Sequence, residues 1–263
     1  MTITLNYLST QNPHERDSHI TFKEDSHIYT VDGVSNYVSV TSWNHSHFEA
    51  FDSDKIIDRM MKSRKWSESK YFGKTKDEIK AIWDSSKNSA SGEGTKLHYD
   101  IECYYNNVEN PNDSIEYGYF KRFVEDYKHL KPYRTEWIIW DSETRISGTI
   151  DMVFENQDGT LSIYDWKRAK EINKTSGYNK SAITECISHI PDTNYWHYVL
   201  QLNTYKYILE TKYNKIVKEL YLLCLHPNNP NYQRISVPVI IDEVTDLMEL
   251  RKSMISQKEE PVV

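Results

Sequence analysis

Two short apolar runs near the middle of the chain constrain its fold more than any other feature. Residues 147–154 (SGTIDMVF) and 161–167 (LSIYDWK) are rich in β-branched and aromatic side chains, and a turn sequence containing Asn and Gly separates them. This pattern predicts two strands that pair as a hairpin. Side chains alternate along a strand, so Asp165 and Lys167 share one face. Asp151 shares a face with Thr149 and Val153, and if the two strands pair as a hairpin, two carboxylates and one ammonium can converge on a single point.

Such a convergence has a chemical use. Two neighbouring carboxylates repel one another, and charges on a half-buried strand are costly unless they are paired or bind a metal. A divalent cation relieves the repulsion, polarises a phosphoryl oxygen and lowers the pKa of a bound water. A lysine beside it can stabilise developing negative charge or orient the water. The alternative is a surface hairpin with a solvated Asp-x-Lys pair, because such tripeptides are common.

Composition indicates a globular protein with one large domain, or one domain with a small appendage. The chain has 263 residues, of which 38% are hydrophobic and 27% charged, and its 20 Tyr and 7 Trp can build a core. The formal net charge of −7 argues against a general polyanion binder. A nuclease stays compatible with this charge, because metal-binding carboxylates add negative charge and a local basic groove can contact phosphates.

Cysteine usage and hydropathy predict an intracellular protein, in the cytoplasm or, if the protein is viral, in the host cell. Cys103, Cys186 and Cys224 form no CxxC pair, which argues against a zinc ribbon or a four-cysteine iron–sulfur cluster. Scattered thiols fit a reducing compartment. No apolar run approaches the length of a membrane span and no secretory signal is recognisable, so we expect no membrane partner.

The N-terminal part is expected to be a loose lead-in followed by a small β-meander. Residues 1–18 are polar and irregular, and alternation over residues 19–22, 27–31 and 37–41 predicts three short strands. Four histidines in this region match no familiar zinc spacing and are interpreted as surface residues. They are His19, His27, His45 and His47.

Two helices are predicted next, over residues 53–64 and from Thr75, where Thr75 and Glu78 match a capping box. The region is locally basic, which fits either a solvated helical face or a rim that contacts phosphates. The basic residues are Lys55, Arg59, Lys62, Arg64, Lys65 and Lys70.

A glycine-containing segment presents a second pair of candidate ligands. Gly92 and Gly94 are expected to end one helix, and Thr95 can cap a new one. His98 and Glu102 are four residues apart and therefore share a helical face. The pair could complete a metal site begun by the two aspartates, or it could be an ordinary polar face.

The rest of the chain supplies further helices, strands and a basic loop. Helices are predicted over residues 115–130, 195–210 and 242–255, and strands over residues 135–140, 217–225 and 232–240. Glu136 on the first of these strands is a secondary candidate for the site. The loop after Lys167 could carry a nucleic-acid backbone or simply be exposed. Its basic residues are Arg168, Lys170, Lys174 and Lys180.

Four motifs, in order and on the expected element types, resemble the PD-(D/E)XK nuclease superfamily and in particular its RecB-type exonuclease branch. They are Gly94-Thr95-x-x-His98-x-x-x-Glu102, Gly148-x-Ile150-Asp151, Asp165-x-Lys167 and Gln201-x-x-x-Tyr205. A softer likeness, in Val38–Ser42 with Phe48 and Phe51, is to viral and phage exonucleases and to the mitochondrial genome maintenance exonuclease.

The resemblance implies an α/β (α+β) fold of the restriction-endonuclease type, with a mixed central sheet flanked by helices. Residues 1–90 would form the N-terminal β-meander and helical part, packed on a nuclease core of residues 91–263 in one continuous unit.

The resemblance also implies roles for individual residues. His98, Asp151, Asp165 and the Trp166 carbonyl would bind Mg²⁺ or Mn²⁺, and Lys167 would be the catalytic lysine. Glu102 would bind the metal through water or steady the site. Gln201 and Tyr205 would position the nucleic acid or the lysine. Further contacts to nucleic acid are expected from Arg168, Lys170 and Thr95.

The function implied is a metal-dependent deoxyribonuclease, an exonuclease acting on single-stranded or frayed DNA ends in repair, recombination or viral genome processing. Replication or recombination proteins are possible partners. Two alternatives stay open from the sequence, namely an RNA-cleaving endonuclease with the same metal site and a catalytically silent nucleic-acid-binding subunit.

Overall fold

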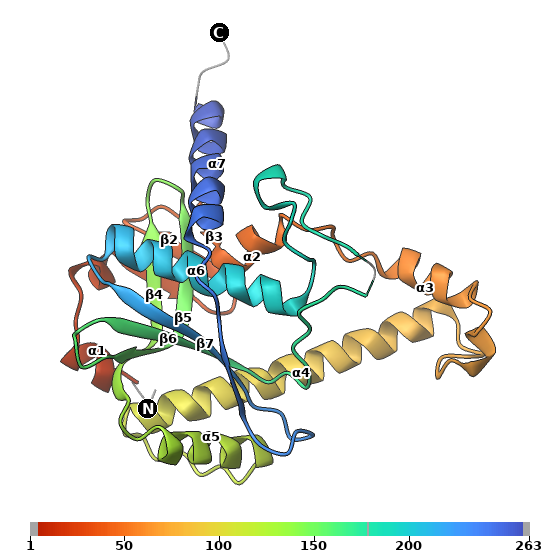
Figure 1. The fold of residues 1–263 in the computed structure, drawn as a ribbon, viewed down its shortest axis with the longest axis horizontal. Coiled ribbons are helices and arrows are strands. Elements are labelled where there is room, and N and C mark those ends of the chain that lie inside the picture. Colours follow the sequence, from red (N-terminus) through yellow and green to blue (C-terminus); the bar gives the residue numbers. More distant parts are fainter. Residues whose placement is uncertain (1–4, 178, 260–263) are drawn as a thin grey trace.

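A mixed sheet of six strands forms the centre of the protein, which is described here by a computed structural model covering residues 5–177 and 179–259 (Figure 1). Within it β4–β5, β5–β6 and β7–β8 are antiparallel pairs, whereas β3–β5 and β6–β7 are parallel. The strands of this sheet are β3 (Val38–Ser39), β4 (Lys131–Asp141), β5 (Ile146–Glu155), β6 (Leu161–Lys167), β7 (Val217–Cys224) and β8 (Gln233–Ser236).

The central strand β5 has one complete edge and one divided edge. β4 pairs along its whole length, from Ile146 to Glu155. On the opposite edge β6 pairs with residues 152–155 and β3 pairs with residues 146–147. Residues 148–151 lie between these two ladders. Asp151 therefore occupies the position where β6 diverges from β5 and an opening forms in the sheet.

Helices cover both faces of the sheet. α2, α6 and α7 pack on one face, and α1, α4 and α5 pack on the other (Figure 1). No helix within the described residues is long and apolar enough to cross a membrane. The α-helices are α1 (Tyr7–Gln11), α2 (Val40–His45), α3 (Ser53–Met61), α4 (Lys76–Tyr105), α5 (Ile115–Asp126), α6 (Asn194–Lys212) and α7 (Ile241–Glu259), and the 3-10 helices are η1 (Glu15–His19), η2 (Trp66–Glu68) and η3 (Glu185–Ile187).

Side-chain alternation in β6 assigns its residues to these two faces. Ile163 belongs to the hydrophobic cluster under α6, whereas Tyr164 and Trp166 belong to the cluster under α4 and α5. Asp165 and Lys167 are an even number of residues from Ile163, so both lie on the α6 face, and the predicted sharing of one face is confirmed. The mixed α/β fold with its helical layers is confirmed.

The N-terminal part contains a two-stranded antiparallel sheet, β1 (Ile20–Lys23) and β2 (Ile28–Val31). The third strand expected for a β-meander instead joins the central sheet as β3, and Ser39 caps α2 directly after it. The prediction of a loose lead-in over residues 1–18 is wrong for the described residues 5–18, because α1 and part of η1 lie there.

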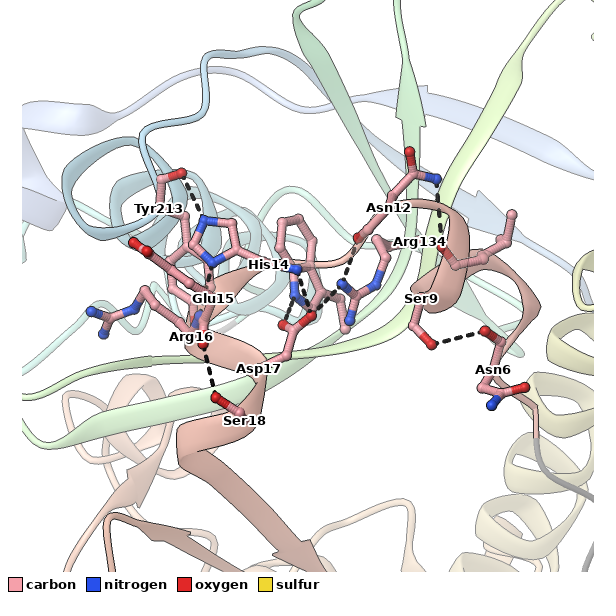
Figure 2. Close-up of polar contacts among 12 residues, drawn as sticks. Asn6, Ser9, Asn12, His14, Glu15, Arg16, Asp17, Ser18, Arg134 and Tyr213 are labelled. Carbon is pink, nitrogen blue, oxygen red and sulfur yellow. Dashed lines mark hydrogen bonds and ion pairs between the residues drawn. The ribbon is translucent and has the colours of Figure 1, made fainter.

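Polar contacts attach this N-terminal segment to β4 (Figure 2). The Asp17 carboxylate accepts hydrogen bonds from Arg134 Nη1 at 2.7 Å and from Trp137 Nε1 at 3.0 Å. Arg134 also donates to the Asn12 carbonyl. Because only 7% of the Arg134 side chain is exposed, its charge depends on this pairing. The segment thus holds the strand that carries Glu136.

α4 continues through the two glycines that were expected to interrupt it. The predicted capping box is confirmed, with Thr75 and Glu78 bonded reciprocally at the start of the helix. Gly92 and Gly94 lie within the helix, and neither has a positive φ. Each glycine costs about 1 kcal/mol relative to alanine. Burial of apolar residues at both ends of α4, such as Ile79 and Ile101, offsets that cost.

The interpretation of the N-terminal histidines as surface residues is wrong for one of them. His47 is buried, and its Nδ1 lies 2.9 Å from the Thr184 hydroxyl. Burial lowers the pKa of His47 to about 4. His19, in contrast, is exposed and pairs with Asp32.

Asp17→Ala should lower the free energy of unfolding by about 2 to 4 kcal/mol, because the buried Arg134 guanidinium loses its charged partner. Denaturant unfolding measures this loss. Glu15→Ala is the matched control, since Glu15 is an exposed acidic residue of the same 3-10 helix. Equal stability of the two variants would contradict the anchoring role of Asp17.

Gly148→Ala should destabilise the protein by about 1 to 3 kcal/mol through overpacking. A Cβ at this position would lie 2.8 Å from Tyr205 Cε1 and 3.0 Å from Val40 Cγ2. Gly118→Ala, on the exposed side of the first turn of α5, meets no atom within 4 Å and should instead stabilise by about 0.5 to 1 kcal/mol. Urea unfolding should therefore show a lower free energy of unfolding for Gly148→Ala and a higher one for Gly118→Ala. An unchanged free energy of unfolding for Gly148→Ala would show that α6 is not closely packed there.

Candidate functional site

Three carboxylates stand in one row across the central sheet. Thr135 pairs with Met152 and Trp137 pairs with Ile150, so Glu136 of β4 lies opposite Asp151 of β5. Met152 and Tyr164 form the last pair of the β5–β6 ladder, so Asp165 is the first residue of β6 beyond it and stays close enough to Asp151 for the two charges to interact. Glu136, Asp151 and Asp165 thus come from three adjacent strands at one level of the sheet.

Glu136 has an unusual backbone conformation for a strand residue. Its φ is +42°, in the left-handed region that a side chain with a Cβ rarely adopts. Such a conformation costs about 1 to 2 kcal/mol. Retention of this strain in the middle of a long strand, directly beside two other carboxylates, is typical of functional positions.

The backbone of Trp166 connects Asp151 to the imidazole of His98 on α4. Its N–H donates to Asp151 Oδ2 at 2.9 Å, and its carbonyl accepts from His98 Nε2 at 2.9 Å. The other ring nitrogen of His98 lies 3.6 Å from Asp151 Oδ2 and 3.8 Å from Glu136 Oε1. His98 therefore reaches the carboxylate row from the α4 face, at the point where β6 diverges from β5.

Asp165 and Lys167 form a buried ion pair on the α6 face. Lys167 Nζ lies 2.7 Å from Asp165 Oδ2, and the side chains are 18% and 1% exposed. Asp165 Oδ1 is buried and has no hydrogen-bond partner within the described residues. The ammonium also lies over the Tyr198 ring, 4.7 Å from its centroid. One carboxylate oxygen thus remains free to accept a further positive partner.

The charges of the cluster change its pKa values. Burial raises the pKa of Asp165 to about 7, the Asp151 charge adds to this rise, and Lys167 opposes it. Burial also raises the pKa of Asp151. For His98, burial lowers the pKa, but the Asp151 and Glu136 carboxylates together raise it to about 9. Protons therefore neutralise part of the negative charge that the residues would otherwise carry at neutral pH.

The donor set fits a divalent cation. One ligand atom from each of His98, Glu136 and Asp151 lies within 4.8 Å of the others, close enough to share one ion. Two of these donors are carboxylate oxygens, which Mg²⁺ prefers, and the imidazole makes Mn²⁺ an equally suitable ion. Asp165, with its unpartnered oxygen, is adjacent in the row.

Glu102 lies beside this cluster and not within it. It shares a hollow of about 590 Å³ with His98, Glu136 and Thr95, which confirms that His98 and Glu102 lie on one helical face. Burial, with smaller contributions from Glu136 and Glu24, raises the pKa of Glu102 to about 7. The hollow is therefore acidic, and a cation bound near Glu136 would lower these pKa values.

Gln201 and Tyr205 approach the row from α6. Gln201 Nε2 donates to the Tyr205 hydroxyl at 3.1 Å, and Tyr205 is buried against Gly148. Burial raises the pKa of the Tyr205 phenol well above its usual value; the hydrogen bond from Gln201 lowers it, and the Asp151 charge raises it further. Tyr205 is thus a neutral hydrogen-bonding group beside the carboxylates.

Three residues predicted to contact nucleic acid have different surroundings. Thr95 is exposed and lines the acidic hollow, and Lys170 is exposed beyond the end of β6. Arg168 is only 13% exposed and pairs with Glu93 and Glu116, so it ties β6 to α4 and α5. Contacts of all three to nucleic acid stay predictions.

Two residues emphasised by the geometry carried weaker signals in the sequence. Glu136 was a secondary candidate, because its alignment with Asp151 depends on the pairing of β4 with β5. Tyr198, which contacts Lys167, was not singled out. It precedes Gln201 by three residues, and that spacing on a helix placed it on the same face.

Comparisons with known proteins return only remote structural likenesses. No protein-family model and no curated protein matches the chain. A solved structure named SSO0001 is 14% identical with a TM-score of 0.34, covering 95% of this chain and 85% of that one. Identity and TM-score at these levels are too low to indicate a shared function.

Two other structures are named as exonucleases. The "Putative exonuclease" of Eubacterium rectale is 14% identical with a TM-score of 0.39, over 84% of this chain and 79% of that one. The alkaline exonuclease LHK-Exo of Laribacter hongkongensis is 12% identical with a TM-score of 0.29, over 82% and 96%. These values are equally low, so the function proposed below rests on the geometry of the site.

Binding of Mn²⁺ should strengthen as the pH rises from about 6 to 9. The metal requires deprotonated ligands, and the proton of Asp165 is lost near pH 7 and that of His98 near pH 9. Calorimetric titration in buffers of different ionisation enthalpy should therefore detect proton release. An affinity that does not change with pH would contradict these pKa values.

Asp151→Asn should weaken Mn²⁺ binding at least about tenfold, the minimum expected when even an indirect metal-supporting group is lost. Asp158→Asn is the control, since Asp158 is an exposed aspartate in the β5–β6 turn that pairs with Lys218. Similar affinities in the two variants would show that the ion binds elsewhere.

Proposed function

We propose that this protein is a metal-dependent nuclease of the RecB-type branch that hydrolyses DNA phosphodiester bonds, acting as an exonuclease on single-stranded or frayed ends. The observation that carries the proposal is the row of three carboxylates with Lys167 ion-paired to one end and His98 beside its centre. The ordered sequence motifs, including Gln201 and Tyr205, support the exonuclease branch.

The carboxylate row is suited to hold one or more divalent ions. Asp151, Glu136 and His98 supply donors that lie close enough for a shared ion, and Asp165 supplies an adjacent one. When bound, such an ion lowers the pKa of a water and stabilises charge on the phosphate. The Asp151 side chain is held for this role by the Trp166 N–H, so it needs little rearrangement.

Lys167 is the group best placed to act on the phosphate. The neighbouring Asp165 and Asp151 charges outweigh burial and raise its pKa, so the ammonium keeps its proton at neutral pH. A protonated lysine can stabilise the negative charge that develops on the phosphoryl oxygens, or orient the attacking water. Lysine carries a compact point charge on a flexible stem, so an arginine, with its larger planar guanidinium, would not replace it automatically.

Gln201 and Tyr205 would orient the substrate on the α6 side of the site. Tyr205 presents a neutral hydroxyl next to the carboxylates, and Gln201 fixes the direction of that hydroxyl. A neutral donor there can bind a phosphate oxygen without competing with the metal for the carboxylates.

Lys167→Ala and Asp165→Asn should each lower cleavage of end-labelled linear DNA by about 10²-fold or more, which is the usual cost of removing one charge-stabilising group. The assay compares Mg²⁺, Mn²⁺ and EDTA on single-stranded and duplex substrates, and a circular single strand tests the need for an end. Lys170→Ala, an exposed lysine close by in sequence, is the matched control.

Full activity of Lys167→Ala, or cleavage in EDTA, would overturn this mechanism. Cleavage of the circular strand would replace the exonuclease with an endonuclease. RNA is included as a competitor, because degradation of RNA alone would assign the same site to an RNA-cleaving enzyme.

A further inference from the structure

A strongly basic segment lies outside the site described above. Residues 59–74 contain six Lys and Arg residues and one Glu, a formal net charge of +5. The whole chain carries −7, so the remaining residues carry −12. These sixteen residues comprise the end of α3, η2 and the loop that leads into α4; we call them the basic arm. Its cations are Arg59, Lys62, Arg64, Lys65, Lys70 and Lys74.

All six of these side chains are exposed, and none forms an ion pair within the described part of the chain. Three acidic residues that flank the arm are already engaged. Asp58 pairs with Lys76, Asp54 pairs with Lys80, and Glu78 completes the cap of α4. The cations of the arm thus have no direct ion-pair partner within the described residues, and concentrated unpaired cations attract a polyanion.

Aromatic rings are interleaved with these cations. Phe72 is 58% exposed, and its ring lies 6.0 Å from that of Trp66. Lys70 Nζ lies 5.0 Å from the centre of the Tyr71 ring, and Tyr71 is itself fixed by a hydrogen bond from Trp83. Exposed aromatic rings beside cations form the usual platform for unpaired bases, which stack on the rings while the cations bind phosphates.

The basic arm stands well away from the carboxylate row but is rigidly connected to it. α4 runs without interruption from the arm to the sheet, with α3 beside its outer end (Figure 1). His98 lies 22 residues after Lys76 on this helix, or ~33 Å at the rise of an α-helix. A single strand with stacked bases advances roughly 3.4 Å per nucleotide, so about ten nucleotides span this distance.

We propose that the basic arm is a binding surface for single-stranded DNA that holds the strand about ten nucleotides from the site of cleavage. This inference rests on the proposed function for the identity of the ligand. The unpaired cations favour a nucleic acid over a protein partner. The exposed rings favour a single strand over a duplex, because paired bases do not offer their faces for stacking.

Binding of a fluorescent 20-nucleotide single strand, measured by anisotropy in EDTA at several salt concentrations, tests the proposal without cleavage. The double variant Lys62→Gln/Lys65→Gln should reduce the slope of log affinity against log salt by about 1.4, because each cation contributes about 0.7 on a single strand. Phe72→Ala should weaken binding about tenfold and leave the slope unchanged, because it removes stacking and no charge.

The matched control is Lys128→Gln/Lys218→Gln, which removes two exposed lysines from other parts of the surface. It should bind like the wild type. The wild-type protein should bind the 20-nucleotide strand more tightly than a six-nucleotide strand, since the short strand cannot occupy the arm and the site together.

Equal binding by the arm variants and the control, or equal wild-type affinities for the two strand lengths, would overturn the proposal. Because these measurements contain no metal, they are independent of catalysis. A wild-type protein that binds the 20-nucleotide strand through the arm but cuts no nucleic acid would overturn the proposed nuclease function and leave the arm assignment intact.

Discussion

Repulsion among three carboxylates, two of them buried in the central sheet, is the constraint on which the rest of the structure depends. Asp151 and Asp165 are buried, and Glu136 stands next to them in a strained conformation. The positive charges of Lys167 and His98 offset this repulsion. Protonation of Asp165, whose pKa is raised to about 7, reduces it further. The compensation is partial, because one Asp165 oxygen keeps no partner within the described residues. A divalent cation would complete it, and binding of that cation would release the protons that now substitute for it.

The architecture of the sheet creates the place for this cluster. β6 and β3 share one edge of β5, and the interval between them lets α4 and α6 reach the same residues from opposite faces. Gly148 belongs to this interval, where its lack of a side chain admits the Tyr205 ring. The N-terminal segment holds the other side of β5 in position through Asp17 and β4. Elements far apart in the sequence thereby support a single group of side chains.

Local sequence patterns predicted the features that depend on interactions between residues close together in the chain. The alternation in residues 161–167 correctly placed Asp165 and Lys167 on one face, and the Thr75–Glu78 spacing correctly located the start of a helix. Features that depend on pairing between segments distant in the sequence were harder to predict. Alignment of Glu136 with Asp151 follows from the β4–β5 register, and Gly92 and Gly94 remain helical because α4 is buried at both ends. Arg168 looked like an exposed phosphate contact, but two distant glutamates engage it.

The central claim is that the carboxylate row binds a catalytic divalent ion. Crystals grown with Mn²⁺ and measured at the manganese absorption edge test it most directly. We predict an anomalous peak at direct coordination distance from Asp151, His98 and Glu136, whose donor atoms lie within 4.8 Å of one another, with the adjacent Asp165 carboxylate available to complete the coordination shell. A peak bound only by exposed carboxylates elsewhere, with the His98–Trp166 and Lys167–Asp165 contacts unchanged, would contradict the account.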